Sequence, residues 1–364
     1  MEKRVYNFSP GPAVLPLPAL EEAQRDLLAL PGTGTSILEI SHRSKAFDKI
    51  VTGAEANIRT LLAIPDNYRV LFMQGGAVLQ FGMIPMNFLR GTGKPADYIV
   101  NGTWSKKAFD EAKTQGNARA IWDSKSSNYN RVPKQSELKI DPDAAYVYMT
   151  SNETIQGVQY QTEPEVGNAP LICDASSDIL CRPIPIQKYA MIFACAQKNV
   201  GPSGVTLVII RDDMVAKSPA DLPSLLNYKV FAEGKSLLNT PPTFAIYMVK
   251  LVTDWLLNKV GGLDKMAEIN KQKAKLLYDT IEQSKGFYMA HAEPDCRSMM
   301  NVPFKLAKTE LEEPFLKEAM AQGLCELKGH RSVGGCRASI YNAMPTEGVK
   351  QLRDFMLDFA KKNA

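Results

Sequence analysis

The stretch Tyr189-Ala-Met-Ile-Phe-Ala-Cys-Ala-Gln-Lys198-Asn-Val-Gly-Pro-Ser-Gly-Val205-Thr-Leu-Val-Ile-Ile210 decides the fold of this chain. Its two ends are apolar, which predicts two buried strands, and the Gly-Pro-Ser-Gly between them predicts a turn. A parallel crossover needs about a dozen residues or more, and the link over residues 196–205 is shorter. We therefore expect the strand after Lys198 to run antiparallel to the strand before it.

Further strand-like runs precede this stretch, and helical patterns separate several of them. Strands that alternate with helical crossovers predict a mostly parallel sheet covered by helices on both faces. The expected fold class is therefore α/β, with one antiparallel strand in the sheet. The predicted strands cover residues 69–73, 97–101, 118–122, 145–149, 170–173, 190–193 and 205–210, and the predicted helices of this part cover residues 77–89 and 105–113.

The pattern changes after residue 242. A long helix over residues 243–259 ends at Gly261-Gly262, and an amphipathic helix over residues 263–283 follows it. Short strands mixed with helices then predict a smaller α+β domain. We divide the chain into an N-terminal arm (1–15), a large domain (16–258) and a small C-terminal domain (259–364). The later strands are expected at 287–290, 299–306, 324–328 and 336–342, and the later helices at 311–322 and 346–362.

Composition excludes several classes of protein. The chain has 364 residues, of which 45% are hydrophobic and 23% are charged, so a globular protein with a large core is expected. The net charge of +4 is small and the basic residues are scattered, which argues against a nucleic-acid partner. No apolar run approaches the roughly 18 residues of a membrane span, and the N-terminus lacks the apolar core of a secretion signal.

The six cysteines form no C-x-x-C pair and no metal-ligand rhythm with the three histidines. Most of them lie in or beside apolar runs, where reduced core cysteines are usual. We therefore expect a cytoplasmic protein without disulfides and without a bound metal.

Lys198 and Asp174 each follow a predicted buried strand. Burial lowers the pKa of a lysine, as an amine needs in order to attack a carbonyl and hold it as a Schiff base. An aspartate at the end of a strand can keep a pyridine nitrogen protonated. Both residues belong to the same edge of adjacent strands, where ligands of α/β sheets bind. Alone, Lys198 could extend to solvent and Asp174 could cap a turn; together they predict a pyridoxal 5'-phosphate site.

Three further features lie where a strand gives way to a helix or loop. Gly75-Gly76-Ala77 lets backbone N–H groups approach a phosphate at a helix N-terminus. Trp104 can stack on a flat ring, and Thr154 can donate a hydroxyl hydrogen bond. Taken singly, the Gly-Gly turn is more often an ordinary turn, Trp104 a hydrophobic plug and the run around Thr154 a polar loop.

Several motifs together resemble the phosphoserine aminotransferase family, within the class V aminotransferases that depend on pyridoxal phosphate. The resemblance runs from end to end of the chain. It implies the fold-type I architecture of these enzymes and a homodimer whose active sites lie at the subunit interface. The motifs are Asn7-Phe-Ser-Pro-Gly-Pro-Ala13, Thr35-Ser-Ile-Leu-Glu-Ile-Ser-His-Arg43, Asp174-Ala-Ser-Ser-Asp-Ile-Leu180, Ala196-Gln-Lys-Asn-Val-Gly-Pro-Ser-Gly204, Asn239-Thr-Pro-Pro-Thr-Phe244 and Gly329-His-Arg-Ser-Val-Gly-Gly-Cys-Arg-Ala-Ser-Ile-Tyr-Asn-Ala-Met344.

The resemblance also implies roles for residues at the coenzyme. Lys198 would carry the Schiff base and move the substrate proton, Asp174 would pair with the pyridine nitrogen, and Trp104 would stack on the ring. Asn239 and Thr240 would reach the coenzyme phosphate of the neighbouring subunit. The remaining expected contacts to the coenzyme come from Gly76, Ala77, Val78, Thr154 and Gln197.

Five basic residues are the candidates for substrate binding. Arginine presents a planar fork that matches a carboxylate or a phosphate. The pairs His42-Arg43 and His330-Arg331 would each be ordinary surface patches if considered alone. The resemblance implies that Arg337 binds the substrate α-carboxylate and that the two His-Arg pairs bind the side-chain phosphate. Glutamate would then place its γ-carboxylate where the phosphate binds.

The implied reaction transfers an amino group reversibly between L-glutamate and 3-phosphohydroxypyruvate, giving O-phospho-L-serine and 2-oxoglutarate for serine biosynthesis. Use of 4-phosphohydroxy-L-threonine in pyridoxine biosynthesis stays open. One alternative is a cysteine desulfurase, which needs a reactive cysteine on a mobile loop, whereas Cys325 and Cys336 lie in strand-like runs. Another is a protein of this fold that only binds ligands. Cys195 stands where the family often has glycine.

Overall fold

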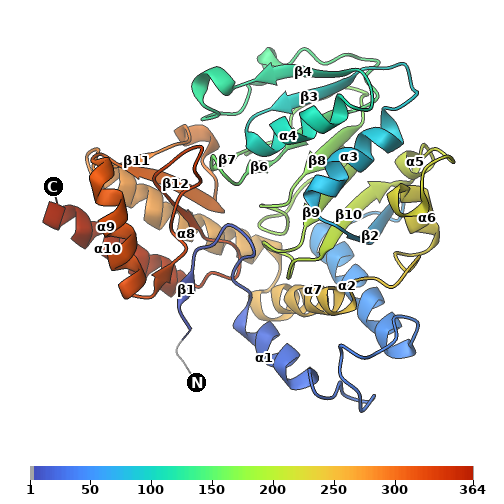
Figure 1. Ribbon diagram of the computed structural model, residues 1–364, viewed down its shortest axis with the longest axis horizontal. Helices are drawn as coiled ribbons and strands as arrows, with labels where there is room; N and C mark the ends of the chain where they lie inside the picture. Colours follow the sequence, from blue (N-terminus) through green and yellow to red (C-terminus); the bar gives the residue numbers. More distant parts are fainter. Residues whose placement is uncertain (1–3, 364) are drawn as a thin grey trace.

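The computed structural model describes residues 4–363 and has two regions of different architecture (Figure 1). The larger one is built on a sheet that has seven strands within the described residues. In spatial order these strands are β2 (Tyr68–Gln74), β10 (Val205–Arg211), β9 (Met191–Cys195), β8 (Leu171–Asp174), β5 (Val147–Thr150), β3 (Ala96–Val100) and β4 (Ala118–Asp123).

Strand directions follow the length of the links between strands. β9 and β10 are antiparallel, with Cys195 opposite Thr206 and Met191 opposite Ile210. β10 is also antiparallel to β2, whereas the pairs β9–β8, β8–β5, β5–β3 and β3–β4 are parallel. The expectation of a mostly parallel sheet with one reversed strand is confirmed. As a result, Asp174 ends β8 at the same edge at which the chain leaves β9 toward Lys198.

Side chains alternate between the two faces of this sheet, and helices cover both faces. Val70 and Phe72 of β2 pack into the core shared with α1 (Leu17–Asp26), α2 (Lys45–Leu62) and α7 (Thr243–Trp255). Leu71 and Met73 point to the other face. There they join α3 (Ala77–Phe88), α4 (Thr103–Ala112), α5 (Asp212–Val215) and α6 (Tyr228–Glu233).

No helix or strand was predicted for residues 17–62, where the structure has α1 and α2. The signals for α2 are nevertheless present. The Ser44 hydroxyl caps the helix by accepting a hydrogen bond from the Phe47 backbone N–H, and buried Phe47, Ile50 and Val51 recur at helical spacing. These two helices complete the core around α7, which places α7 inside the large region.

The smaller region has its own core. Its antiparallel sheet consists of β11 (Tyr288–Ala290), β12 (Asn301–Leu306) and β14 (Cys336–Ser339). The helices α8 (Leu263–Gln283), α9 (Glu312–Ala321) and α10 (Thr346–Asn363) pack with it. The predicted strand 324–328 is shorter than expected: only β13 (Leu324–Cys325) forms, paired in parallel with β1 (Tyr6–Asn7) of the arm. The domain boundaries themselves stay a prediction.

No helix within residues 4–363 is both long enough and apolar enough to cross a membrane. In the same part of the chain, no group of three or more His, Cys, Asp and Glu side chains could hold a metal ion. All six cysteines, which fall inside this range, are free.

Candidate active site

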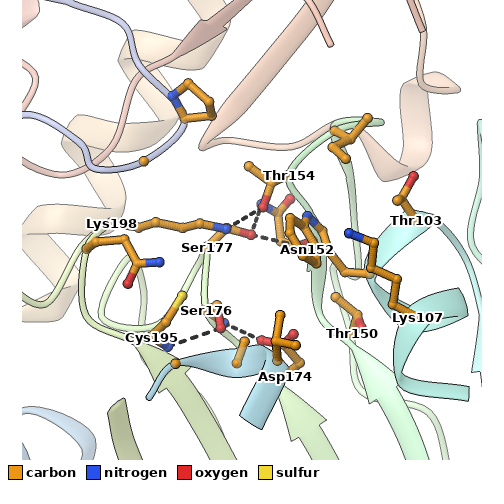
Figure 2. A pocket seen from close by; sticks show the side chains of 18 of the residues that line it. Thr103, Lys107, Thr150, Asn152, Thr154, Asp174, Ser176, Ser177, Cys195 and Lys198 are labelled. Atoms are coloured by element: carbon orange, nitrogen blue, oxygen red, sulfur yellow. Dashed lines mark hydrogen bonds between the residues drawn. The ribbon is translucent and has the colours of Figure 1, made fainter. Parts of the chain in front are cut away.

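A cavity of about 580 Å³ opens at the carboxyl edge of the parallel strands, between the two regions and the N-terminal arm (Figure 2). The arm contributes Pro10 and Gly11 to its lining, and the chain around β14 contributes Arg337. Eleven residues singled out from the sequence line it. They are Gly76, Ala77, Val78, Trp104, Thr154, Asp174, Gln197, Lys198, His330, Arg331 and Arg337.

Asp174 and Lys198 face the same cavity from neighbouring strand ends (Figure 2). Asp174 is 3% exposed, and its Oδ1 accepts a hydrogen bond of 2.9 Å from the Ser176 backbone N–H. Burial raises the pKa of Asp174, while Ser176 and the charge of Lys198 act to lower it. Lys198 Nζ donates a hydrogen bond of 2.6 Å to Thr154 Oγ1. The acid and the amine predicted from sequence are therefore brought together.

The electrostatics of Lys198 differ from the sequence expectation. Burial acts to lower the pKa of Lys198, as expected, but Tyr341, Cys195 and Asp174 act in the opposite direction and leave the pKa raised. The expectation of a lowered pKa is therefore wrong for this arrangement. The Lys198 Nζ is also held by the hydrogen bond that it donates to Thr154 Oγ1.

Arg337 is a buried cation that has no carboxylate partner among residues 4–363. It is 6% exposed, and its Nη1 donates a hydrogen bond of 3.3 Å to the Thr154 carbonyl oxygen. Its Nε is buried and finds no hydrogen-bond partner within residues 4–363. Burial lowers the pKa of Arg337. Since a buried arginine normally pairs with an acid, this guanidinium is available for an anionic ligand.

The cavity as a whole favours anions. Among the described residues of its lining, Asp174 is the single carboxylate, whereas Lys107, Lys198, Arg331 and Arg337 are cations. The pKa of His330 is lowered by burial and by the neighbouring positive charges of Arg337, Arg331 and Lys107. Like charges gathered in a cleft raise the local concentration of an oppositely charged substrate.

Several buried polar atoms of the lining have no partner in the part of the chain that the structure describes. They are Trp104 Nε1, Thr150 Oγ1, Asn152 Oδ1 and Arg337 Nε. Unpaired buried polar groups cost about 1–3 kcal/mol each, and native structures keep few of them. These atoms are therefore available to bind a ligand that has several hydrogen-bonding groups.

Reasoning from the sequence missed Glu153, which holds the start of α4. Glu153 is fully buried; its Oε2 accepts a hydrogen bond from the Trp104 backbone N–H (2.9 Å), and its Oε1 accepts from the Ser105 backbone N–H (2.7 Å). A Cβ at Gly102 would lie 2.2 Å from Glu153 Cδ, so the close approach requires glycine. The signal available was an acidic residue in the polar loop Thr150-Ser-Asn-Glu-Thr154 beside a helix start.

Replacing Glu153 by glutamine should flatten the pH dependence of stability. Burial raises the pKa of Glu153 from its ordinary value of 4.5 to about 7, despite the hydrogen bonds from Ser105 and Trp104. The folded chain therefore binds this proton more tightly than the unfolded chain, and the associated stability is lost as the pH rises from about 4.5 to about 7. That loss is on the order of 3 kcal/mol.

The measurement is urea denaturation at pH 5 and pH 8. The stability of the natural protein should fall more between these pH values than that of Glu153→Gln. The control is Glu310→Gln, which changes an exposed glutamate. Equal slopes for the natural protein and Glu153→Gln would contradict the prediction.

Four predicted site residues do not line the cavity of this chain. Arg43 and Thr240 are exposed, and the Thr240 carbonyl oxygen accepts a hydrogen bond of 3.1 Å from Gln74 Nε2. His42 Nε2 and Asn239 Oδ1 are buried, and neither has a hydrogen-bond partner within residues 4–363. The resemblance assigned Asn239 and Thr240 to a neighbouring subunit, so a single chain does not test these roles.

Other lining residues were not singled out from the sequence as site residues. Most are small or polar, and they lie beside a predicted site residue or in the arm. They are Pro10, Gly11, Thr103, Lys107, Thr150, Asn152, Ile155, Ser176, Ser177, Cys195 and Ser332. Gly75, which belongs to the predicted phosphate-binding turn with Gly76 and Ala77, also lines the cavity.

The sheet, the cavity and its Asp–Lys pair are those expected of a pyridoxal-phosphate-dependent aminotransferase. The family model described as aminotransferase class-V matches residues 5–352. A solved phosphoserine aminotransferase from Bacillus circulans subsp. alkalophilus superimposes with a TM-score of 0.97 at 48% identity, covering 100% of both chains. A phosphoserine aminotransferase solved with PLP bound, from Trichomonas vaginalis, gives a TM-score of 0.92 at 41% identity, covering 97% of this chain and 100% of that one.

A curated phosphoserine aminotransferase from Rhodopirellula baltica is 53% identical over 363 residues, which are 100% of this chain and 96% of the relative. The chain therefore belongs to the phosphoserine aminotransferase family, within the class V aminotransferases. Both the resemblance found in the sequence and the expected fold class are confirmed. The comparisons do not favour a cysteine desulfurase.

Proposed function

We propose that this chain is a phosphoserine aminotransferase that uses pyridoxal 5'-phosphate. It transfers an amino group reversibly between L-glutamate and 3-phosphohydroxypyruvate, and the other two reaction partners are O-phospho-L-serine and 2-oxoglutarate. The observation that carries the proposal is the buried Arg337, a guanidinium without a carboxylate partner among the described residues, which lines one cavity with Lys198 and Asp174.

The residues present fit this coenzyme. Asp174 is the carboxylate that would hold the pyridine nitrogen, and Trp104 offers an indole ring in the same cavity. α3 begins after Gly76 without a side-chain cap, so its first backbone N–H groups are available for a phosphate. Thr154 and Gln197 would supply further hydrogen bonds. When bound, the coenzyme provides an electron-withdrawing ring for the negative charge that develops at the substrate Cα.

The protein side chains bind, orient and move protons. Arg337 would hold the substrate α-carboxylate in two parallel hydrogen bonds. That contact fixes the Cα–H bond relative to Lys198, whose Nζ is kept in place by Thr154 Oγ1. In its neutral form the Lys198 amine would take the proton from the substrate Cα, and in its protonated form it would give that proton up again, which is general acid–base catalysis by a positioned group. Asp174 would stay ionised and hold the proton on the pyridine nitrogen.

The phosphate of the substrate side chain needs further cations. His330 and Arg331 supply them from this chain, because both line the cavity. His42 and Arg43 lie elsewhere on the chain and would come from a second copy, in a homodimer with shared active sites. The unpaired His42 Nε2 and Asn239 Oδ1 support this arrangement, since a second copy would give these buried atoms partners. Asn239 and Thr240 would reach the coenzyme phosphate of that copy.

The enzyme would act in the cytoplasm. Its six cysteines are free, five of them are buried, and Cys325 is half-buried. Reduced cysteines are the rule in a reducing compartment.

The alternative of a cysteine desulfurase finds no suitable thiol. Cys195 lines the cavity but belongs to the rigid strand β9. Cys336 is buried in β14, and burial raises the pKa of its thiol. A protonated thiol is a poor nucleophile.

The proposed function is tested by adding O-phospho-L-serine, without any keto acid, to enzyme loaded with pyridoxal phosphate. The phosphorylated amino acid should convert the bound coenzyme to its amine form, seen as loss of the visible absorbance, at concentrations where L-serine has little effect. A coenzyme that responds equally to L-serine and O-phospho-L-serine would contradict the proposal.

Replacing Arg331 by alanine should damage the use of O-phospho-L-serine selectively. Hydrogen bonds to charged groups contribute about 1.5–3 kcal/mol, and Arg331 is exposed, so we expect the lower end, about a tenfold loss of kcat/KM. L-alanine, which lacks the phosphate, should react almost as well as before. Arg353→Ala on α10 is the control. An equal loss with both substrates would remove Arg331 from the phosphate site.

A further inference from the structure

Lys107 is a cation of the cavity that the proposed function does not use. It lies on α4, and its amine points toward the cavity (Figure 2). Residues three apart share one face of a helix, and the Lys107 Nζ lies 4.5 Å from the centroid of the Trp104 ring. The same ring is 5.9 Å from Lys198 Nζ. Lys107 and the reacting amine therefore both lie near the same indole ring.

Lys106 of α4 and Lys113 just after it make local ion pairs, whereas Lys107 makes none within the described residues. Lys106 Nζ binds Asp110, and Lys113 Nζ lies 2.6 Å from Asp110 Oδ1. Within residues 4–363, no carboxylate oxygen lies within 4 Å of Lys107 Nζ and the side chain is exposed. An exposed lysine on a helix normally gains from a carboxylate three or four residues away. Glu111 stands four residues after Lys107, but the two do not pair within the described residues, and Lys107 lines the cavity.

Lys107 also belongs to the cluster that contains the His330-Arg331 pair. Its charge, together with the charges of Arg337 and Arg331, acts on His330. All four residues line one cavity. Lys107 is therefore close enough to interact with an anion bound by His330 and Arg331, while its long flexible side chain remains in solvent.

The two amino-acid substrates of the proposed reaction differ in charge at this place. A phosphate ester carries about −1.5 to −2 charges at neutral pH, whereas the γ-carboxylate of glutamate carries one. A solvated cation attracts the ligand with more charge more strongly, in proportion to the charge. A cation can therefore bind the phosphate-bearing substrate more strongly than glutamate through long-range attraction alone, without a direct contact that fits only one of them.

We propose that Lys107 is a specificity-determining residue, which favours the phosphate-bearing substrate over glutamate by placing an unpaired positive charge beside Trp104, His330 and Arg331. The proposal rests on the proposed function and adds a residue to it. Its effect is modest because the amine is exposed: for one extra unit of ligand charge a few ångströms away in water we expect about 3- to 10-fold.

The experiment compares the natural enzyme with Lys107→Met and Lys107→Arg, and with Lys106→Met as the matched control on the same helix. Methionine keeps an apolar contact with the Trp104 ring but removes the charge. The dissociation constants of O-phospho-L-serine and L-glutamate are obtained in single-turnover experiments, from the concentration dependence of the rate at which each amino acid removes the visible coenzyme absorbance, at about 20 mM and 500 mM KCl. At low salt, Lys107→Met should raise the dissociation constant of O-phospho-L-serine about 3- to 10-fold more than that of L-glutamate.

Lys107→Arg and Lys106→Met should keep the natural ratio of the two dissociation constants. High salt should shrink the difference between Lys107→Met and the natural enzyme, because exposed charges are screened beyond a few ångströms at that ionic strength. Equal weakening of both ligands by Lys107→Met, or a difference that salt does not change, would overturn the proposal and leave Lys107 as a support for Trp104. If the natural enzyme itself fails to react with O-phospho-L-serine, it is the proposed function that fails.

Discussion

Replacing Lys198 by alanine will abolish turnover and the covalent attachment of the coenzyme. Lys198 Nζ is the amine that Thr154 orients, and it shares the lining of the cavity with Asp174. The other lysine of the lining, Lys107, has its Nζ 4.5 Å from the centroid of the Trp104 ring. A positioned general acid–base contributes about 10²–10⁴-fold, so turnover should fall by at least that factor.

Two readouts separate this result from simple misfolding. Borohydride reduction followed by mass spectrometry should place the coenzyme on the peptide that contains Lys198 in the natural enzyme, and no attachment should be seen in Lys198→Ala. Lys198→Arg should fail likewise, because a guanidinium keeps the charge but is not a nucleophilic amine. Lys106→Ala should behave as the natural enzyme. Attachment at another lysine together with retained turnover would refute the role of Lys198.

The order of the strands explains why this pair could be predicted from the sequence. A link of ten or so residues between two apolar runs is too short to cross a sheet in parallel, and β10 indeed reverses direction after β9. Residues that follow parallel strands share one edge whatever packs around them. The directions of the neighbouring strands alone therefore predict that Asp174 and Lys198 lie close together, without any information about the rest of the fold.

The walls of the cavity could not be predicted in the same way. Arg337 comes from the small region, and Pro10 and Gly11 come from the arm. Only tertiary packing decides that these segments face Lys198. The buried charge of Glu153 was missed for a related reason, since its partners Trp104 and Ser105 lie about fifty residues earlier in the chain. The residue types indicated the chemistry of the site, whereas separation along the sequence did not indicate which residues lie close together in space.

The two helices that were missed illustrate a different limit. α2 carries a serine cap and a regular apolar stripe, so the sequence did contain its signal. The pKa of Lys198 was mispredicted because burial was considered alone. In the folded chain, Tyr341 and Asp174 lie close enough to reverse the effect of burial. A pKa depends on every neighbouring charge, and those neighbours are a tertiary property.

Replacing Arg337 by methionine should separate stability from activity. Removing one partner of a buried charge pair costs about 2–5 kcal/mol, so kcat/KM should fall by about 30- to several-thousand-fold for O-phospho-L-serine and L-glutamate alike, because both have an α-carboxylate. The ligand-free protein should lose little stability. Its guanidinium is buried without a carboxylate partner within residues 4–363 and makes one hydrogen bond there, to the Thr154 carbonyl oxygen.

Burying a cation is costly unless an anion compensates for it. In the free chain, this cost opposes folding; in the complex, the substrate α-carboxylate removes it. Thermal unfolding of Arg337→Met without substrate should therefore occur at or near the natural temperature, while a saturating amino acid should raise the unfolding temperature of the natural enzyme and not that of the variant. Arg353→Met, on the surface of α10, is the control for both measurements. A variant that unfolds much earlier but binds L-glutamate normally would assign Arg337 to the structure of the small region rather than to the substrate.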